Sequence, residues 1–159
     1  MYEKELLGLS DVGARYVLIG GIAIGFHGFV RTTFDLDILP DLESENLGKI
    51  ITVLGGLNYI PRVPVQADEL KDPQKRDVWY REKNMKVFTF LQPNDSRNEV
   101  DLMIYHPLDF EECFARRKNI CMQGRQISLA SAQDLLTLKK IAGRPKDVRD
   151  ITFLEEMIK

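Results

Sequence analysis

The chain has 159 residues, of which 22 are Lys or Arg and 24 are Asp or Glu, so its formal net charge is −2. Hydrophobic residues make up 44% and charged residues 29% of the sequence, as in ordinary folded proteins. This balance argues against a disordered chain, a collagen-like repeat and a strongly basic nucleic-acid coat, and the length suits one compact domain.

Nothing in the sequence predicts a disulfide scaffold or a membrane segment. The two cysteines, Cys113 and Cys121, predict ordinary thiols in a reducing cytoplasm. The longest uncharged run, residues 16–30, contains four glycines and a histidine and is shorter than the about 20 apolar residues that span a bilayer. The first five residues lack the pattern of a signal peptide, so we expect a cytoplasmic protein with no membrane partner.

Strands and helices alternate in the first part of the chain. An apolar run stops at Gly20-Gly21 and predicts a buried strand, and a helical spacing of apolar residues ends at Gly55-Gly56. The pattern predicts, in chain order, a strand over residues 16–19, a glycine-containing helix over 22–29, a strand over 33–39 and a helix over 41–54.

The middle of the chain is less regular and contains a predicted hairpin. Residues 61–84 hold three prolines and many charges. The polar stretch 92–96 is typical of a turn between two strands. We predict a short helix over 72–82, strands over 87–91 and 99–105, a helix over 108–117 and a last, edge strand over 125–129.

Helices close the chain. Ser131, with Asp134 three positions later, resembles a capping box, and the helix that follows stops at Gly143. Pro145 opens another helix, whose predicted apolar face holds Val148, Ile151, Leu154 and Ile158. This order of elements predicts an α+β fold, a mixed β-sheet with flanking helices. We expect residues 1–159 to form a single domain, with C-terminal helices over about 131–159 packed on it.

Two aspartates share one face of the predicted strand over 33–39. Side chains alternate across a strand, so Asp35 and Asp37 lie opposite Phe34, Leu36 and Ile38. Buried carboxylates need a partner, and Mg²⁺ accepts one or two carboxylates together with substrate phosphates. A divalent-cation site and a strand with two solvated aspartates both fit this pattern.

A third aspartate stands in the predicted strand over 99–105. Asp101 lies on the face opposite Val100, Leu102 and Ile104. If this strand neighbours the earlier one, three carboxylates converge as in a two-metal phosphoryl-transfer site. An edge strand with its polar residues outward is the alternative.

The Gly20-Gly21 turn between strand and helix leaves free backbone N–H groups where phosphate is favoured. It is not a dinucleotide-binding fingerprint, because Ile22 stands where that motif needs its second glycine, and the sequence contains no Gly-Lys-Ser or Gly-Lys-Thr of a P-loop. A tight turn that needs small residues also explains the two glycines.

In combination, these motifs resemble the nucleotidyltransferase superfamily, the group with the DNA polymerase β-like catalytic fold. Its signature is a hydrophobic strand, Gly-Gly or Gly-Ser, a short helix, Asp-x-Asp, and a later strand with a third Asp. Two longer segments, residues 19–38 and 129–154, are similar to small bacterial nucleotidyltransferases related to the toxins of abortive-infection toxin–antitoxin systems. The matching motifs are Leu18-Ile19-Gly20-Gly21, Asp35-Leu36-Asp37, Val100-Asp101-Leu102 and the pattern Lys-x-x-x-Gly-Arg-Pro-Lys-Asp-x-x-Asp over 139–150.

The resemblance implies a polymerase β-like fold and a Mg²⁺-dependent enzyme, with Mn²⁺ as the alternative ion. Such an enzyme moves a nucleoside monophosphate from a nucleoside triphosphate to an acceptor hydroxyl and releases pyrophosphate. The residues implied as catalytic and metal-binding are Asp35, Asp37 and Asp101. Those implied as binding the nucleotide phosphates are Gly20, Gly21, Arg31 and Lys139.

The resemblance leaves the acceptor and the partner open. The acceptor could be a small molecule, tRNA or a protein, and a toxin–antitoxin role would add an antitoxin partner. A non-catalytic nucleotide-binding or antitoxin-type partner domain of the same fold is the alternative function.

Several of these residues also have a purely structural interpretation. Arg31 could form a salt bridge with Asp35 or Asp37, and Lys139 could belong to a solvated helix face. We expect structural roles, as orienting, capping, hydrogen-bonded or core residues, for His27, Trp79, Arg144, Lys146, Asp147 and Asp150.

Overall fold

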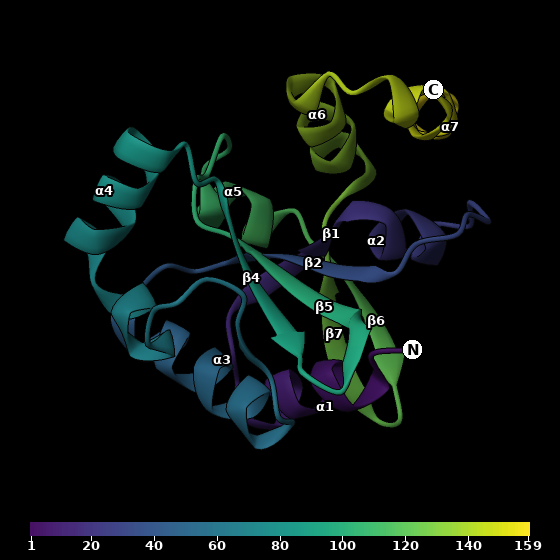
Figure 1. Cartoon of the computed structure of the whole chain (residues 1–159). Helices are drawn as coiled ribbons and strands as arrows, with labels where there is room; N and C mark the ends of the chain where they lie inside the picture. Colours follow the sequence, from purple (N-terminus) through teal and green to yellow (C-terminus); the bar gives the residue numbers. More distant parts are fainter.

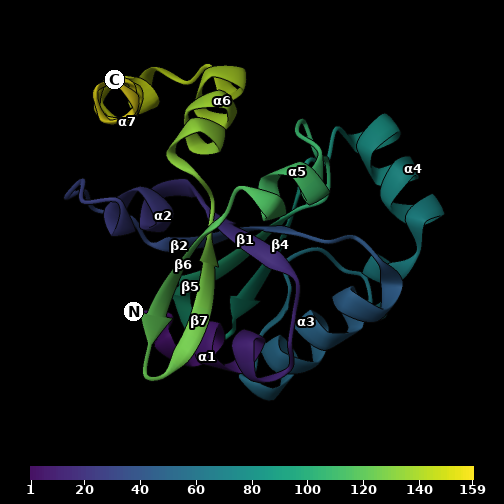
Figure 2. The ribbon, with the colours of Figure 1, turned by 180° about the vertical axis from the view of Figure 1, so that it is seen from behind.

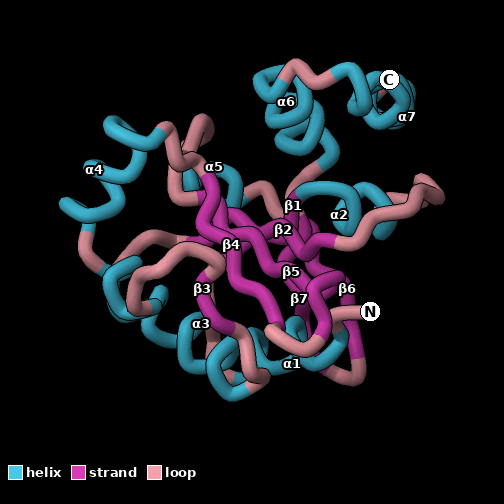
Figure 3. Tube along the Cα trace, in the orientation of Figure 1, coloured by secondary structure: helices cyan, strands magenta, loops and turns pink.

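A seven-stranded mixed sheet lies at the centre of the fold, with helices around it (Figure 3). The computed structural model describes residues 1–159. The strand order is β3-β4-β5-β2-β1-β7-β6, and β2 pairs antiparallel with β1 but parallel with β5. The strands are β1 (Tyr16–Ile19), β2 (Asp35–Pro40), β3 (Ile60–Pro61), β4 (Val87–Gln92), β5 (Asp95–Met103), β6 (Lys118–Met122) and β7 (Arg125–Leu129).

The helices lie on both sides of this sheet. Figure 1 shows α1 and α3 on one side and α6 and α7 on the other. The helices are α1 (Glu3–Asp11), α2 (Gly20–Phe26), α3 (Ser44–Gly56), α4 (Pro73–Lys83), α5 (Phe110–Ala115), α6 (Ala132–Ala142) and α7 (Val148–Ile158), and two 3-10 segments span Ala67–Lys71 and Pro145–Asp147. No helix has the length and apolar character required to cross a bilayer.

Alternate side chains of β2 and β5 face opposite sides of the sheet. Leu36, Ile38, Val100 and Leu102 are fully buried in the core, as the alternation predicts. The side chains between them therefore point to the other face of the sheet. Phe34 does not join the buried row and is 56% exposed. The reason is that β2 begins at Asp35, so Phe34 precedes the strand.

Most of the predicted elements are present, with one correction at the edge of the sheet. The strand over 16–19 and the hairpin of β4 and β5 are confirmed. The strand over 125–129 forms as β7, but it lies between β1 and β6 and is not the edge strand. Figure 2 shows the β6–β7 hairpin that places β6 outside it. Its turn uses Gln123 and Gly124, both at positive φ.

The ends of the C-terminal helices follow the predicted signals. The Ser131 side chain accepts a hydrogen bond from the Asp134 N–H, and Gly143 ends α6 with a φ of 59°. The predicted apolar face of α7 is wrong in part. Leu154 is fully buried, but Val148 is 60% exposed and Ile158 is also exposed. The main neighbour of α7 is α6, so only a narrow stripe of the helix is covered.

Four elements had no counterpart in the sequence prediction: α1, β3, β6 and the 3-10 segment Ala67–Lys71. The first of them builds the core, since Leu6 and Leu9 of α1 are buried. Both cysteines are free thiols, as predicted.

Candidate functional site

A cavity of about 430 Å³ lies between the central strands and the C-terminal helices. It is lined by residues from the β1–α2 turn, β2 and the segment leading into it, strands β4 and β5, helix α6 and the 3-10 turn after it. All seven predicted site residues line this one cavity: Gly20, Gly21, Arg31, Asp35, Asp37, Asp101 and Lys139. Their individual roles stay predictions.

The segment leading into β2, together with the first residues of β2, lines the cavity with every second side chain. Arg31, Thr33, Asp35 and Asp37 all face the cavity, while Leu36, between the two aspartates, is buried in the core. Extended backbone alternates its side chains in this way. One short stretch therefore presents a cation, a hydroxyl and two carboxylates in a row.

Register brings the third aspartate beside the other two. Strands β2 and β5 run parallel, with Asp37 directly opposite Asp101. The Thr89 hydroxyl of β4 donates a hydrogen bond of 2.6 Å to Asp101 Oδ1. At the start of β2, the Tyr2 hydroxyl contacts the backbone carbonyls of Phe34 and Glu99. These contacts hold the two strands in the register that joins the carboxylates.

The carboxylates on the sheet are electrostatically unfavourable to one another. Burial raises the pKa of Asp37 to about 7, and the charges of Asp101 and Asp35 add to this effect, while Lys139 and Arg144 oppose it. Burial also raises the pKa of Asp101, which the hydrogen bond from Thr89 partly offsets. Like charges held close together in a partly dry site favour the protonated form.

The side-chain positions in the structure do not by themselves form a metal cage. No group of three or more His, Cys, Asp and Glu side chains is arranged to hold a metal ion. The metal-ligand roles of Asp35, Asp37 and Asp101 therefore stay predictions.

Gly20 is required by the carboxylate next to it. Its φ of 70° lies in the left-handed region, and a Cβ on this residue would lie 2.1 Å from Asp37 Oδ2. No side chain fits there. The glycine turn thus allows the backbone to approach the aspartate directly.

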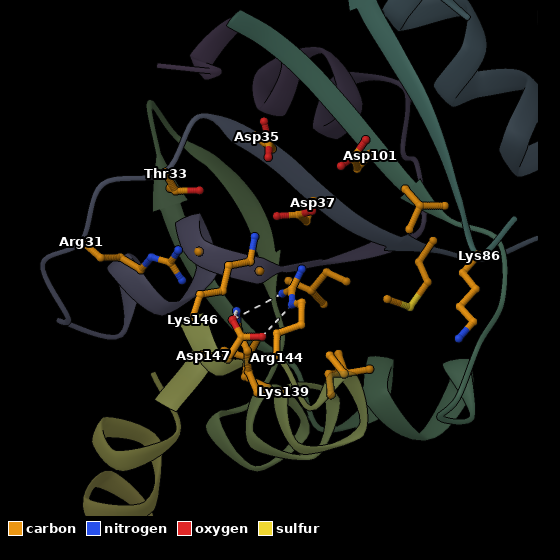
Figure 4. A pocket seen from close by; sticks show the side chains of 18 residues that line it. Arg31, Thr33, Asp35, Asp37, Lys86, Asp101, Lys139, Arg144, Lys146 and Asp147 are labelled. Carbon is orange, nitrogen blue, oxygen red and sulfur yellow. Dashed lines mark hydrogen bonds and ion pairs between the residues drawn. The ribbon is translucent and has the colours of Figure 1, made fainter. Parts of the chain in front are cut away.

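Cations line the opposite side of the cavity, which Figure 4 shows across from the three aspartates. Lys139 Nζ lies 2.7 Å from Asp147 Oδ1 and 3.0 Å from Asp150 Oδ2. Arg144 Nε lies 2.7 Å from Asp147 Oδ2, and Arg31 pairs with Asp150. The two C-terminal aspartates therefore hold three of the cavity's cations in place.

These ion pairs correct two of the structural interpretations. Arg31 does form a salt bridge, but its partner is Asp150 of α7 and neither of the β2 aspartates. Lys139 is not on a solvated face, because it is only 6% exposed. The structural roles expected for Asp147 and Asp150 as orienting residues are confirmed by their contacts with Lys139.

Two other structural expectations are confirmed. A ring nitrogen of His27 lies 2.9 Å from the Ala130 carbonyl oxygen. Trp79 is buried and stacks on Phe88, with 5.5 Å between ring centroids.

Sequence reasoning missed two polar residues of the cavity, Thr33 and Lys86. The alternation that paired Asp35 with Asp37 also places Thr33 on their face, so this signal was present. Lys86 precedes β4, and nothing in its local sequence distinguishes it from other lysines.

No model of a known protein family matches the chain, and neither does the sequence of any curated protein. Solved structures do resemble it. The solution structure of the antibiotic-resistance factor ANT(2'')-Ia matches with a TM-score of 0.63 at 12% identity, covering 99% of this chain and 82% of that one. Its complex with adenylyl-2''-tobramycin matches with a TM-score of 0.62 at 12% identity, covering 98% and 86%.

The lincomycin-bound lincosamide antibiotic adenylyltransferase LnuA has a TM-score of 0.60 at 16% identity, with 96% of each chain covered. Identities this low establish the fold alone. The chain has the fold of the nucleotidyltransferases, and the predicted α+β architecture, a mixed sheet with flanking helices, is confirmed.

Proposed function

We propose that the chain is a metal-dependent nucleotidyltransferase, with residues 1–159 as one catalytic domain. It moves a nucleoside monophosphate from a nucleoside triphosphate to an acceptor hydroxyl. The observation that carries the proposal is the arrangement of charge within one cavity. Asp35, Asp37 and Asp101 lie on its sheet side without a cationic partner, and cations lie on its helix side, where Asp147 pairs with two of them.

A metal-bound triphosphate matches this division of charge. Its phosphates carry several negative charges and suit the side formed by Arg31, Lys139, Arg144 and Lys146. Phosphoryl transfer depends mostly on positioning and on neutralising charge. A cavity with both signs of charge provides these two functions without a covalent intermediate.

The carboxylates on the sheet fit Mg²⁺ or Mn²⁺. Mg²⁺ binds through one or two carboxylates plus substrate phosphates, and Asp37 and Asp101 lie directly opposite each other. Lys139 and Arg144 are paired with Asp147, and Arg31 is paired with Asp150. No ion pair joins a cation of the chain to the sheet carboxylates, which leaves these carboxylates available. When bound, the metal ion would neutralise phosphate charge and polarise the α-phosphate.

The reaction that follows from this arrangement is an in-line displacement. The acceptor hydroxyl oxygen forms a bond to the α-phosphorus, the bond from that phosphorus to the oxygen bridging the α- and β-phosphates breaks, and pyrophosphate leaves. Asp101 takes the proton of the acceptor hydroxyl as a general base. Arg31 and Lys139 hold the departing pyrophosphate.

The acceptor in this proposal is a hydroxyl-bearing small molecule, with tRNA and protein as the other candidates. Structural neighbours support this choice, since one was solved with lincomycin and another with adenylyl-2''-tobramycin. A toxin–antitoxin role, with an antitoxin partner, and a cytoplasmic location complete the proposal.

The test is transfer of labelled nucleotide. Each of the four α-labelled nucleoside triphosphates is incubated with the protein, Mg²⁺ or Mn²⁺, and acceptors that include aminoglycosides, lincosamides, tRNA and the protein itself. We expect a labelled product that disappears with EDTA and with Asp37→Asn. Asp77→Asn, which removes an exposed carboxylate from α4, is the matched control and should keep full activity.

The following outcomes would decide between the functions. Equal product from wild type and Asp37→Asn would contradict the proposal. Triphosphate binding without transfer to any acceptor would favour the non-catalytic nucleotide-binding domain. Growth arrest on expression that Asp37→Ala relieves would support the toxin role, and growth at the normal rate would oppose it.

A further inference from the structure

A hydroxyl group lies between the two charged sides of the cavity. Thr33 lines the cavity in the alternating row that begins with Arg31 and ends with Asp37. Figure 4 shows its side chain between the Arg31 side and Asp35, and draws no hydrogen bond from it to the other side chains of the cavity. Its hydroxyl therefore has donor capacity to offer to a ligand.

The neighbouring glycine makes room for this hydroxyl. A Cβ on Gly21 would lie 2.8 Å from Thr33 Oγ1, 2.9 Å from Thr33 Cβ and 3.2 Å from Arg31 Cζ. A side chain at position 21 would push both neighbours aside. The bare backbone of Gly21 thus lets Thr33 and Arg31 pack against the glycine turn at the cavity wall.

The spacing of the row gives the hydroxyl a defined place along a bound triphosphate. Alternate side chains of an extended segment are roughly 6–7 Å apart. A nucleotide whose α-phosphate lies at Asp35 and Asp37, and whose terminal phosphate lies at Arg31, must pass Thr33 in between. The phosphate nearest Thr33 is one of those that leave as pyrophosphate.

We propose that the Thr33 hydroxyl donates a hydrogen bond to a non-bridging oxygen of the β- or γ-phosphate. This inference rests on the proposed function and adds a binding residue to it. Thr33 carries no charge, so its contribution is directional and fixes the rotation of the phosphate chain between Arg31 and the carboxylates.

The test separates the hydroxyl of Thr33 from its shape. Thr33→Val keeps the branched shape and removes the hydroxyl, whereas Thr33→Ser keeps the hydroxyl and removes the methyl group. Thr32→Val is the matched control, because Thr32 is exposed and does not line the cavity. Calorimetry measures the Kd of inorganic tripolyphosphate and of each nucleoside triphosphate with Mg²⁺, and circular dichroism confirms that each variant is folded.

We expect Thr33→Val to weaken binding of both probes about three- to tenfold, as one lost hydrogen bond predicts. Thr33→Ser should bind within about twofold of wild type, and Thr32→Val should not differ from it. Nucleoside monophosphate, which lacks the β- and γ-phosphates, should lose less affinity than the triphosphate in Thr33→Val.

Other results would overturn the inference in distinguishable ways. If Thr33→Val binds as wild type, or if Thr33→Ser is weakened as much as Thr33→Val, the residue acts through packing and the inference is wrong while the proposed function stands. If wild type binds neither tripolyphosphate nor any nucleoside triphosphate, the proposed function fails and this inference fails with it.

Discussion

Two sets of aspartates lie at the same cavity and are treated in opposite ways by the fold. On the sheet, Asp37 and Asp101 face each other, and burial together with neighbouring carboxylates raises the pKa of Asp37 to about 7. At the C-terminal helices, burial would raise the pKa of Asp147, but hydrogen bonds from Arg144 and Lys139 outweigh it and lower the pKa below 3.8.

The difference lies in what surrounds each carboxylate. The C-terminal aspartates are satisfied by cations of this chain, so they act as structure and hold Lys139 and Arg31 in position. The aspartates on the sheet have no such partner and retain the capacity to bind a cation from outside. Residue type alone does not separate a structural carboxylate from a ligand-binding one.

The largest loss of activity is expected on substitution of Gly20, because Asp37 leaves no room for a side chain there. A Cβ at Gly20 would overlap Asp37 Oδ2, so Gly20→Ala should displace this carboxylate and lower nucleotide transfer about a hundredfold or more. Steady-state kinetics measure the change. The matched control is Gly25→Ala in the same helix, because nothing lies within 4 Å of a Cβ there, and it should retain activity.

The second prediction concerns the carboxylates that are paired with cations at the C-terminal helices. Asp147 is 1% exposed and holds Lys139 and Arg144. Asp147→Asn should lower the free energy of unfolding by about 2 kcal/mol in urea titrations at pH 7, because Lys139 keeps only Asp150.

The pH dependence of this variant follows from the lowered pKa of Asp147. Its stabilising contribution is present above the ordinary value of 3.8 and is lost as the pH falls below it. The gap between wild type and Asp147→Asn should therefore narrow in acid. A gap that stays constant from pH 7 to pH 3 would show that the ion pair is not its source.

For the sheet carboxylates, the change of stability with pH should have the opposite sign. Unfolded Asp37 releases its proton near 3.8 and folded Asp37 near 7, so wild type loses stability as the pH rises between these values. Asp37→Asn has no such penalty. In EDTA at pH 8 its free energy of unfolding should exceed that of wild type by on the order of 2 kcal/mol, since water reaches part of this carboxyl.

Thermal unfolding across pH 4 to 8 measures this gain. The two proteins should have similar stability near pH 4, and Mg²⁺ should stabilise wild type more than Asp37→Asn. A variant that is less stable than wild type at every pH would oppose the electrostatic account of the sheet carboxylates.

The smallest effect on stability is expected at Lys140, the residue after the buried Lys139. Lys140 pairs with Glu155 at 2.7 Å, but both side chains are about half exposed. Lys140→Ala should change the free energy of unfolding by no more than about 0.5 kcal/mol. Lys139→Ala, measured in the same urea titration, should cost several times more. Equal effects at the two lysines would remove the distinction between buried and exposed ion pairs.

The face of each β2 and β5 side chain was predictable because a strand alternates with a period of two. That period placed Asp35 and Asp37 on one face of β2 and Asp101 on the polar face of β5, and the local cap signals located both ends of α6. It failed at Phe34, because β2 begins only at Asp35 and Phe34 lies outside the strand. The helical spacing of apolar residues failed at Val148, because the packing partner of α7 covers only part of that helix.

Local chemistry in the sequence determined the strand period, the helix caps and the glycine turn, since each depends on residues a few positions apart. Only the tertiary structure decided that β2 and β5 are neighbours and that Arg31 pairs with Asp150 rather than with the β2 aspartates. Pairing between distant segments depends on how the chain folds back on itself. The pKa of each aspartate depends on the burial and the neighbours that result.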